Sequence, residues 1–205
     1  MSLKLIWELS WTLAKTNLKL KNEGSFLGFL WYILNPLLLF ILIYSVFSQM
    51  VGQDIPNYAL YLLLGIIMWN FISSTTTEAL KSSKRQLIKS INFPLETMVI
   101  SNILASVISH IFEIIVFILF LIWFKVSILG VVYYVPLFFL FTCFILGISF
   151  FLSALNPYLS DLENIWGFFV KLLFFATPIF YSISAKSNLF ILSLFNPFYY
   201  FISGA

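Results

Sequence analysis

The sequence has very few of the residues on which metal centres, disulfides and nucleotide sites depend. Among its 205 residues are one cysteine, one histidine and only 9% charged residues. Cys143 alone cannot form a disulfide within the chain, and with His110 it is too little for a Cys/His zinc cage. No glycine precedes a lysine, which excludes the Gly-x-x-x-x-Gly-Lys phosphate loop. We therefore expect no metal, no cofactor and no catalytic residues in this chain.

Apolar residues make up most of what is present. The chain is 61% hydrophobic and 20% aromatic, and its mean hydropathy is +1.03. A soluble domain needs only about half of its residues to be apolar, so the surplus must face lipid or other membrane segments. Alternating in/out patterning is absent, and a helix satisfies its own backbone hydrogen bonds in hydrocarbon. We predict an all-α integral membrane protein.

Several apolar runs are long enough to cross the ~30 Å hydrocarbon core of a bilayer. The five predicted spans are residues 26–48, 58–74, 99–123, 131–155 and 165–181. A further apolar run at 189–202 is too short to cross and is interrupted by Asn196-Pro197. It predicts an external re-entrant region over residues 182–205, within a single transmembrane domain over residues 1–205.

Positive charge is distributed unevenly between the predicted loops. Eight of the eleven Lys and Arg residues flank the first span on its N-terminal side or lie between the second and third spans, at Lys4, Lys15, Lys19, Lys21, Lys81, Lys84, Arg85 and Lys89. By the positive-inside rule these segments lie in the cytoplasm. The sequence therefore predicts a multi-pass protein of the cytoplasmic (inner or plasma) membrane with a cytoplasmic N-terminus.

Residues 1–22 have the pattern of an amphipathic helix. Its apolar face carries Leu3, Trp7, Trp11, Ala14 and Leu18. Because a span follows directly, we interpret this segment as an interfacial helix on the cytoplasmic membrane surface rather than as a soluble helix.

Ionisable residues inside spans are costly, at about 2.5 to 3.5 kcal/mol per charge at mid-span. His110 and Glu113 share one face of the third span through their i, i+3 spacing, and Lys171 lies in the fifth. Our hypothesis is that Glu113 and Lys171 form an intramembrane ion pair. Such a pair either locks helices together or belongs to a proton relay.

Two predicted cytoplasmic loops carry apolar residues among their polar ones. In the first, Leu87, Ile88, Ile91 and Phe93 are interleaved with basic and polar residues before Pro94. The second, from Asn156 to Asp161, combines a helix stop with an acidic turn residue. Each is either a solvated topogenic loop or a docking surface for a cytoplasmic partner.

The order of short motifs along the chain resembles one transporter family. The motifs are Ser25-x-x-Gly28-x-x-Trp31-x-x-x-Asn35-Pro36, Ile55-Pro56-Asn57-Tyr58, Trp69-Asn70-Phe71, Leu87-Ile88-Lys89, Asn92-Phe93-Pro94, Asn156 with Asp161-Leu162, Thr177-Pro178-Ile179-Phe180-Tyr181 and Asn196-Pro197. In this order they resemble the ABC-2-type permeases that export polysaccharides, over nearly the whole chain.

The resemblance implies a homodimeric permease for a lipid-linked O-antigen, capsule or teichoic-acid polymer. Two separate ATP-binding cassette subunits would bind ATP. We expect no nucleic-acid partner. It implies coupling to these subunits through Lys84, Arg85, Leu87, Ile88, Lys89, Phe93, Pro94, Asn156 and Asp161. Five aromatic residues are expected either to line the channel or to serve as packing and interface-belt residues. They are Trp31, Tyr32, Tyr44, Trp69 and Tyr181.

Two departures from the family pattern accompany this resemblance. Ser160 stands where the family commonly has an arginine before Asp161. The family also has a sixth span, so we expect a truncated chain at Ala205. The alternatives are an ABC-2 exporter of a small amphiphile or drug, a membrane-embedded transferase, and a purely structural membrane subunit.

Overall fold

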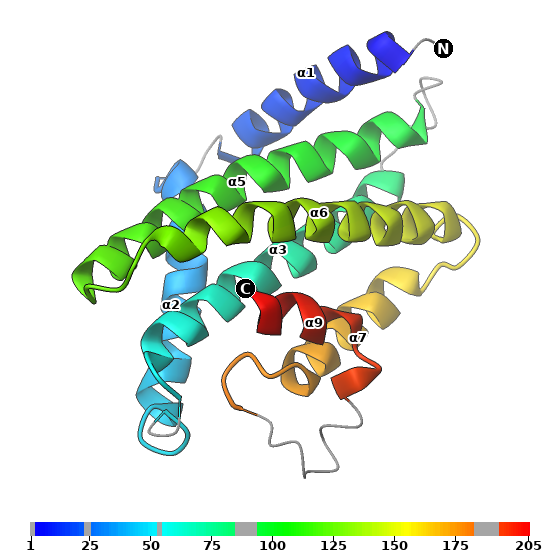
Figure 1. The fold of residues 1–205 in the computed structure, drawn as a ribbon. Helices are drawn as coiled ribbons and strands as arrows, with labels where there is room; N and C mark the ends of the chain where they lie inside the picture. Colours follow the sequence, from blue (N-terminus) through cyan, green and yellow to red (C-terminus); the bar gives the residue numbers. More distant parts are fainter. Residues whose placement is uncertain (1–2, 23–25, 53–54, 85–93, 183–192) are drawn as a thin grey trace.

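A computed structural model describes residues 3–22, 26–52, 55–84, 94–182 and 193–205 (Figure 1). Within these ranges the regular elements are all helical: α1 (Leu3–Asn22), the 3-10 turn η1 (Gly28–Leu30), α2 (Trp31–Phe47), α3 (Tyr58–Lys84), α5 (Leu95–Trp123), α6 (Leu129–Leu155), α7 (Leu162–Ala176) and α9 (Pro197–Gly204). The predicted all-α fold class is confirmed.

Three helices are long and apolar enough to cross a membrane. They comprise residues Tyr58–Ser82, Leu95–Trp123 and Leu129–Leu155, while α2 is an apolar helix of 17 residues and α7 has 15. The second predicted run ended at residue 74, but α3 continues to Lys84. Its additional turns contain hydroxyl residues that bond back to helix carbonyls, as Thr76 Oγ1 does to Ile72 O at 2.8 Å. Polar residues thus ended the apolar run without ending the helix.

The fifth predicted run, 165–181, corresponds to a shorter helix. α7 ends at Ala176, and the next residue, Thr177, is extended with ψ of 134°. Thr177 precedes Pro178, whose ring disfavours helical geometry in the residue before it. The chain from Thr177 to Tyr181 therefore leaves α7 as a non-helical segment.

α3 is the central helix of the bundle. It contacts α2, α5, α6 and α7. Of an apolar 18-residue stretch in each helix, 72% is buried in α3, against 22% in α5 and in α6. Leu62, Leu63 and Met68 are completely buried in its core-facing surface. A helix that is buried on all sides is typical of the centre of a large bundle.

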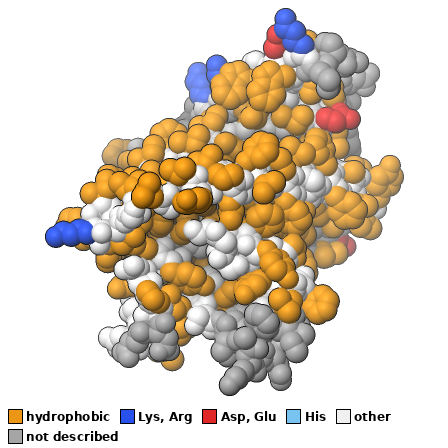
Figure 2. Space-filling view, in the orientation of Figure 1, with side chains coloured by type: hydrophobic (Ala, Val, Ile, Leu, Met, Phe, Trp, Pro, Cys, Tyr) orange, Lys and Arg blue, Asp and Glu red, His pale blue; other side chains and the backbone are white. Residues whose placement is uncertain are grey.

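The outer surface of the bundle is strongly apolar. Hydrophobic side chains cover most of the face shown in Figure 2, with Lys, Asp and Glu side chains toward its periphery. Residues such as Leu119, Phe139 and Phe168 are more than half exposed along their helices. A monomeric soluble protein rarely exposes apolar patches of this extent, and lipid is the solvent that accommodates them. The chain is a multi-pass membrane protein.

α1 packs lengthwise along the first part of α5 (Figure 1). Ser10 and Ala14 are fully buried there, because their small side chains allow close approach of the two helices. Trp7 and Trp11, from the predicted apolar face, stay exposed. The amphipathic helix is confirmed, and the structure adds a contact with α5 that its sequence pattern did not reveal.

Long-range hydrogen bonds hold the chain after α7 in place. Tyr58 Oη donates to Phe180 O at 2.9 Å, and Tyr61 Oη donates to Pro178 O. Asn196 caps α9 by accepting from Phe198 N and donates its Nδ2 to Thr177 Oγ1 at 2.8 Å. Tyr58 and Tyr61 thus fix the segment just after α7 to the start of α3, and Asn196 ties the described part of the predicted re-entrant region to Thr177 at the end of α7.

Candidate functional site

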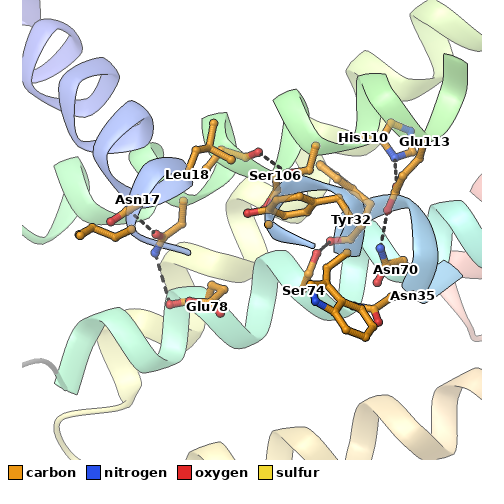
Figure 3. A pocket seen from close by; sticks show the side chains of 17 residues that line it. Asn17, Leu18, Tyr32, Asn35, Asn70, Ser74, Glu78, Ser106, His110 and Glu113 are labelled. Atoms are coloured by element: carbon orange, nitrogen blue, oxygen red, sulfur yellow. Dashed lines mark hydrogen bonds and ion pairs between the residues drawn. The ribbon is translucent and has the colours of Figure 1, made fainter. Parts of the chain in front are cut away.

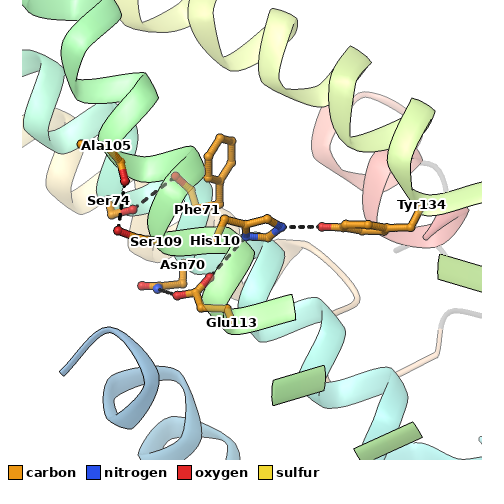
Figure 4. Close-up of polar contacts among 8 residues, drawn as sticks. All are labelled: Asn70, Phe71, Ser74, Ala105, Ser109, His110, Glu113 and Tyr134. Carbon is orange, nitrogen blue, oxygen red and sulfur yellow. Dashed lines mark hydrogen bonds and ion pairs between the residues drawn. The ribbon is translucent and has the colours of Figure 1, made fainter. Parts of the chain in front are cut away.

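Four polar side chains form a hydrogen-bonded chain across the middle of the bundle (Figure 4). Asn70 Nδ2 on α3 donates to Glu113 Oε1 on α5. Glu113 Oε2 lies 3.2 Å from His110 Nδ1, one turn earlier on α5. His110 Nε2 lies 2.7 Å from Tyr134 Oη on α6. The chain joins α3, α5 and α6 in their apolar interior.

His110 and Glu113 are almost completely buried, and aromatic rings pack against the imidazole. Only 2% of the surface of His110 and 3% of that of Glu113 are exposed. The Phe138 ring stacks on the His110 ring at 4.3 Å with an interplanar angle of 8°, and Phe71 lies 5.2 Å away. Low local polarity strengthens each bond and makes the loss of any partner costly.

The prediction that His110 and Glu113 share one face of α5 is confirmed, but the predicted partner of Glu113 is wrong. The Glu113 carboxylate accepts a hydrogen bond from Asn70 and lies within hydrogen-bond distance of His110. Glu113 forms no ion pair with Lys171. Lys171 is exposed on α7 instead. Asn70 and Tyr134 were not among the predicted site residues, although an amide in the middle of an apolar run indicates a buried partner.

A large polar cavity lies beside this chain, between α1, η1, α2, α3 and α5 (Figure 3). Its volume is about 640 Å³. Its polar lining residues are Asn17, Tyr32, Asn35, Asn70, Ser74, Glu78, Asn102, Ser106, Ser109, His110 and Glu113. No Lys or Arg occurs among the described residues that line it. We call it the amide cavity.

Hydrogen bonds between α1, α3 and α5 fix the part of the amide cavity around Asn102. Asn102 Nδ2 on α5 donates to Ser82 Oγ at 2.9 Å and to Glu78 O at 3.3 Å, both on α3. Asn17 Nδ2 on α1 donates to Asn102 Oδ1 at 3.3 Å. The C-terminal part of α1 is thereby tied to α5 directly and, through Asn102, to α3.

A second cavity of about 350 Å³ lies between α2, α3 and α7. Lys171 lines it, together with Trp69 and Phe174. Asn35 and Asn70 line both cavities. The two asparagines therefore lie between the amide cavity, which contains carboxylates, and the second cavity, which contains a lysine.

The five aromatic candidates do not share one surface. Trp31 and Tyr32 line the amide cavity. Trp69 is buried in the core against Phe174 and also lines the second cavity. Tyr44 stacks on Tyr58 at 6.0 Å, and Tyr181 Oη donates to Phe175 O at 2.8 Å.

The described coupling residues gather at one end of the bundle, where α3 and α6 end and α5 and α7 begin (Figure 1). Lys84 is the last residue of α3 and Pro94 is the N-cap of α5. Asn156 is buried and donates its Nδ2 to Leu80 O at 2.8 Å, whereas Asp161 is exposed at the N-cap of α7. Arg85, Leu87, Ile88, Lys89 and Phe93 lie outside the described residues.

The loop from Asn156 to Asp161 presents apolar side chains at this end. Tyr158 is 85% exposed and Leu159 is 48% exposed. Asn156 anchors the loop to α3, so the exposed side chains start from a fixed backbone. In the part of the chain that the structure describes, no group of three or more His, Cys, Asp or Glu residues is arranged to hold a metal ion.

Comparison with known proteins places the chain in a family of membrane permeases. Residues 8–205 match the family model described as ABC-2 type transporter. The chain belongs to this family. It is also similar to O-antigen export system permease proteins RfbA.

Two of these relatives are from Klebsiella pneumoniae and one is from Myxococcus xanthus. The Klebsiella proteins are 30% and 31% identical to the chain, over 88% and 89% of its length and 71% and 74% of theirs. The Myxococcus protein is 29% identical, over 84% of the chain and 68% of its own length.

Proposed function

We propose that this chain is the membrane-spanning permease subunit of an ABC exporter that moves a lipid-linked polysaccharide across the cytoplasmic membrane. The family match over residues 8–205, together with the named O-antigen export relatives, is the observation that carries the proposal. The bundle fits this role because its apolar exterior encloses the amide cavity and the second cavity, which Lys171 lines. The energy for export comes from a separate ATP-binding subunit, which binds the ATP.

The exposed loop Asn156–Asp161 is the proposed docking surface for that subunit. Tyr158 and Leu159 offer an apolar contact at the end of the bundle where Lys84 and Pro94 also lie. Apolar anchors of this kind, surrounded by polar residues, are typical of protein interfaces. Arg85, Leu87, Ile88, Lys89 and Phe93, which lie outside the described residues, are also coupling residues in our proposal.

The permease acts as a homodimer in this proposal, and Lys171 is the residue that supports it. Lys171 lies about 14 Å along α7, at nine residues from its start and 1.5 Å per residue. It is exposed and has no ion-pair partner among the described residues. A lysine facing hydrocarbon at that depth is unfavourable, so this face of α7 turns to a polar path shared with a second copy.

The proposed orientation places the N-terminus and the docking end in the cytoplasm. The sequence of α1 is basic, and so is the stretch from Lys81 at the end of α3 to Lys89, which favours the cytoplasmic side for both. In this orientation Trp7 and Trp11 of α1 lie at headgroup depth. The spans are α2, α3, α5, α6 and α7, and α9 belongs to the external re-entrant region.

Co-purification in lipid tests this proposal directly. The tagged chain is expressed with the ATP-binding subunit encoded beside it, and the complex in lipid vesicles is assayed for ATP hydrolysis and polymer export. We expect Tyr158→Ala to weaken the complex at least fivefold. Tyr133→Ala is the matched control, since Tyr133 is 79% exposed near the start of α6, at the opposite end of that helix. No complex with any ATP-binding subunit contradicts the proposal.

A further inference from the structure

The amide cavity contains hydrogen-bonding groups that the protein leaves unused. Asn35, which is exposed on α2, and Ser106 on α5 line it, and neither side chain has a hydrogen-bond partner among the described residues. Asn70 also lines it and uses its Nδ2 for Glu113, so its Oδ1 has no hydrogen bond within the described residues. These groups are free to bond a hydrogen-bonding molecule that enters the cavity.

The charges on the cavity wall determine which kind of molecule fits. Glu113 lines it, with its carboxylate held by Asn70 and His110, and no Lys or Arg occurs among the described residues that line it. A phosphate or pyrophosphate needs cationic donors and meets repulsion from the Glu113 carboxylate here. A neutral molecule rich in hydroxyl groups meets amide, hydroxyl and carboxylate partners that can both donate and accept.

The cavity also contains flat apolar surfaces. Trp31 and Tyr32 lie on consecutive positions at the start of α2 and both line it, and Tyr32 lies between α2 and Ser106 in Figure 3. An aromatic ring offers an apolar face that fits the C–H face of a sugar ring, next to polar groups that take its hydroxyls. The volume of about 640 Å³ lies in the range of roughly 300 to 1,000 Å³ found for small-molecule sites.

From these observations we infer that the amide cavity within each permease subunit binds neutral sugar residues, through Asn35, Asn70 and Ser106 and the rings of Trp31 and Tyr32. The inference rests on the proposed function, because the exported polymer supplies the sugar. It goes further in assigning sugar recognition to a site inside one subunit and in excluding the phosphate part of a lipid-linked substrate from that site.

Protection of an introduced cysteine measures occupancy of the cavity. Cys143→Ser removes the one native thiol, and Ala105→Cys places a reporter on the α5 wall without removing a polar group. The complex with the ATP-binding subunit, in lipid nanodiscs, is treated with a water-soluble methanethiosulfonate reagent. The probes are neutral disaccharides of glucose, galactose, mannose, rhamnose and N-acetylglucosamine, and inorganic pyrophosphate.

We expect at least one neutral disaccharide to slow modification at position 105 fivefold or more, and pyrophosphate to have no effect. Asn35→Ala and Ser106→Ala should each raise the half-protecting concentration about fivefold, which corresponds to one lost hydrogen bond of about 1 kcal/mol. Ser127→Cys is the control, since this exposed residue lies between α5 and α6 away from the cavity. Its modification should not change.

The inference is overturned if position 105 is not modified at all, if no disaccharide protects it, or if pyrophosphate protects equally well. It is also overturned if Asn35→Ala and Ser106→Ala, shown to be folded by their co-purification, leave protection unchanged. ATP-driven export by the same complex separates the two ideas. Export without cavity protection removes the sugar site and keeps the exporter, whereas sugar protection without an ATP-binding partner removes the exporter and keeps the site.

Discussion

Tyr134 Oη and His110 Nε2 lie 2.7 Å apart and join α6 to α5 in the apolar centre of the bundle. Both residues are buried, and the Glu113 carboxylate holds the other nitrogen of the His110 ring at 3.2 Å. The ring therefore has a partner on each side. Its orientation is fixed by two helices at once.

Tyr134→Phe should destabilise the protein by about 1 to 3 kcal/mol, because it leaves a buried ring nitrogen without a partner. The measurement is thermal unfolding of the purified permease in lipid or detergent. Tyr133→Phe is the matched control, since that neighbouring tyrosine is mostly exposed. Equal midpoints for the two variants would show that the Tyr134 hydroxyl contributes nothing.

Glu113→Gln distinguishes the two interpretations of the buried chain. The chain ends at Tyr134, which is itself buried, so we expect it to lock α3, α5 and α6 together rather than to carry protons across the membrane. The variant should lower the unfolding midpoint and reduce the amount of folded protein. The pH profile of export per folded molecule should keep its wild-type shape. A profile that flattens or shifts would instead support a proton relay.

Lys171→Met should lower export while leaving the protein folded. Lys171 is exposed in the second cavity without an ion-pair partner in the described chain, so its removal breaks no internal contact. If this lysine faces a polar path, replacing it makes that path apolar and slows the polymer several-fold. The assay compares export with the quantity of complex in the membrane. Unchanged export would place Lys171 outside the path.

Gly65→Ala should disturb the packing of α3 against the segment after α7. A Cβ atom at Gly65 would lie 3.0 Å from Ile179 Cγ2 and 3.3 Å from Ile179 O. Overpacking of this kind typically costs about 1 to 3 kcal/mol. Gly147 on α6 has open space where a Cβ atom would lie, so Gly147→Ala should instead be neutral or stabilise the helix by up to about 1 kcal/mol. Unfolding midpoints of the two variants test this contrast, and equal shifts would contradict it.

The sequence alone determined the features that depend on composition and local spacing. Excess hydrophobicity required a membrane, and runs of spanning length required helices. The i, i+3 spacing of His110 and Glu113 placed them together because helix geometry is the same wherever the helix lies. The pattern of residues 1–22 predicted α1 for the same reason.

Only the tertiary structure decided which side chains meet across helices. Glu113 pairs with Asn70 rather than Lys171, and Trp69 lies in the core. These outcomes depend on the rotation and depth at which each helix packs, which hydropathy leaves open because lipid-facing and core-facing residues are equally apolar. The amide cavity has the same origin, since its walls come from α1, α2, α3 and α5 and exist only where those helices meet.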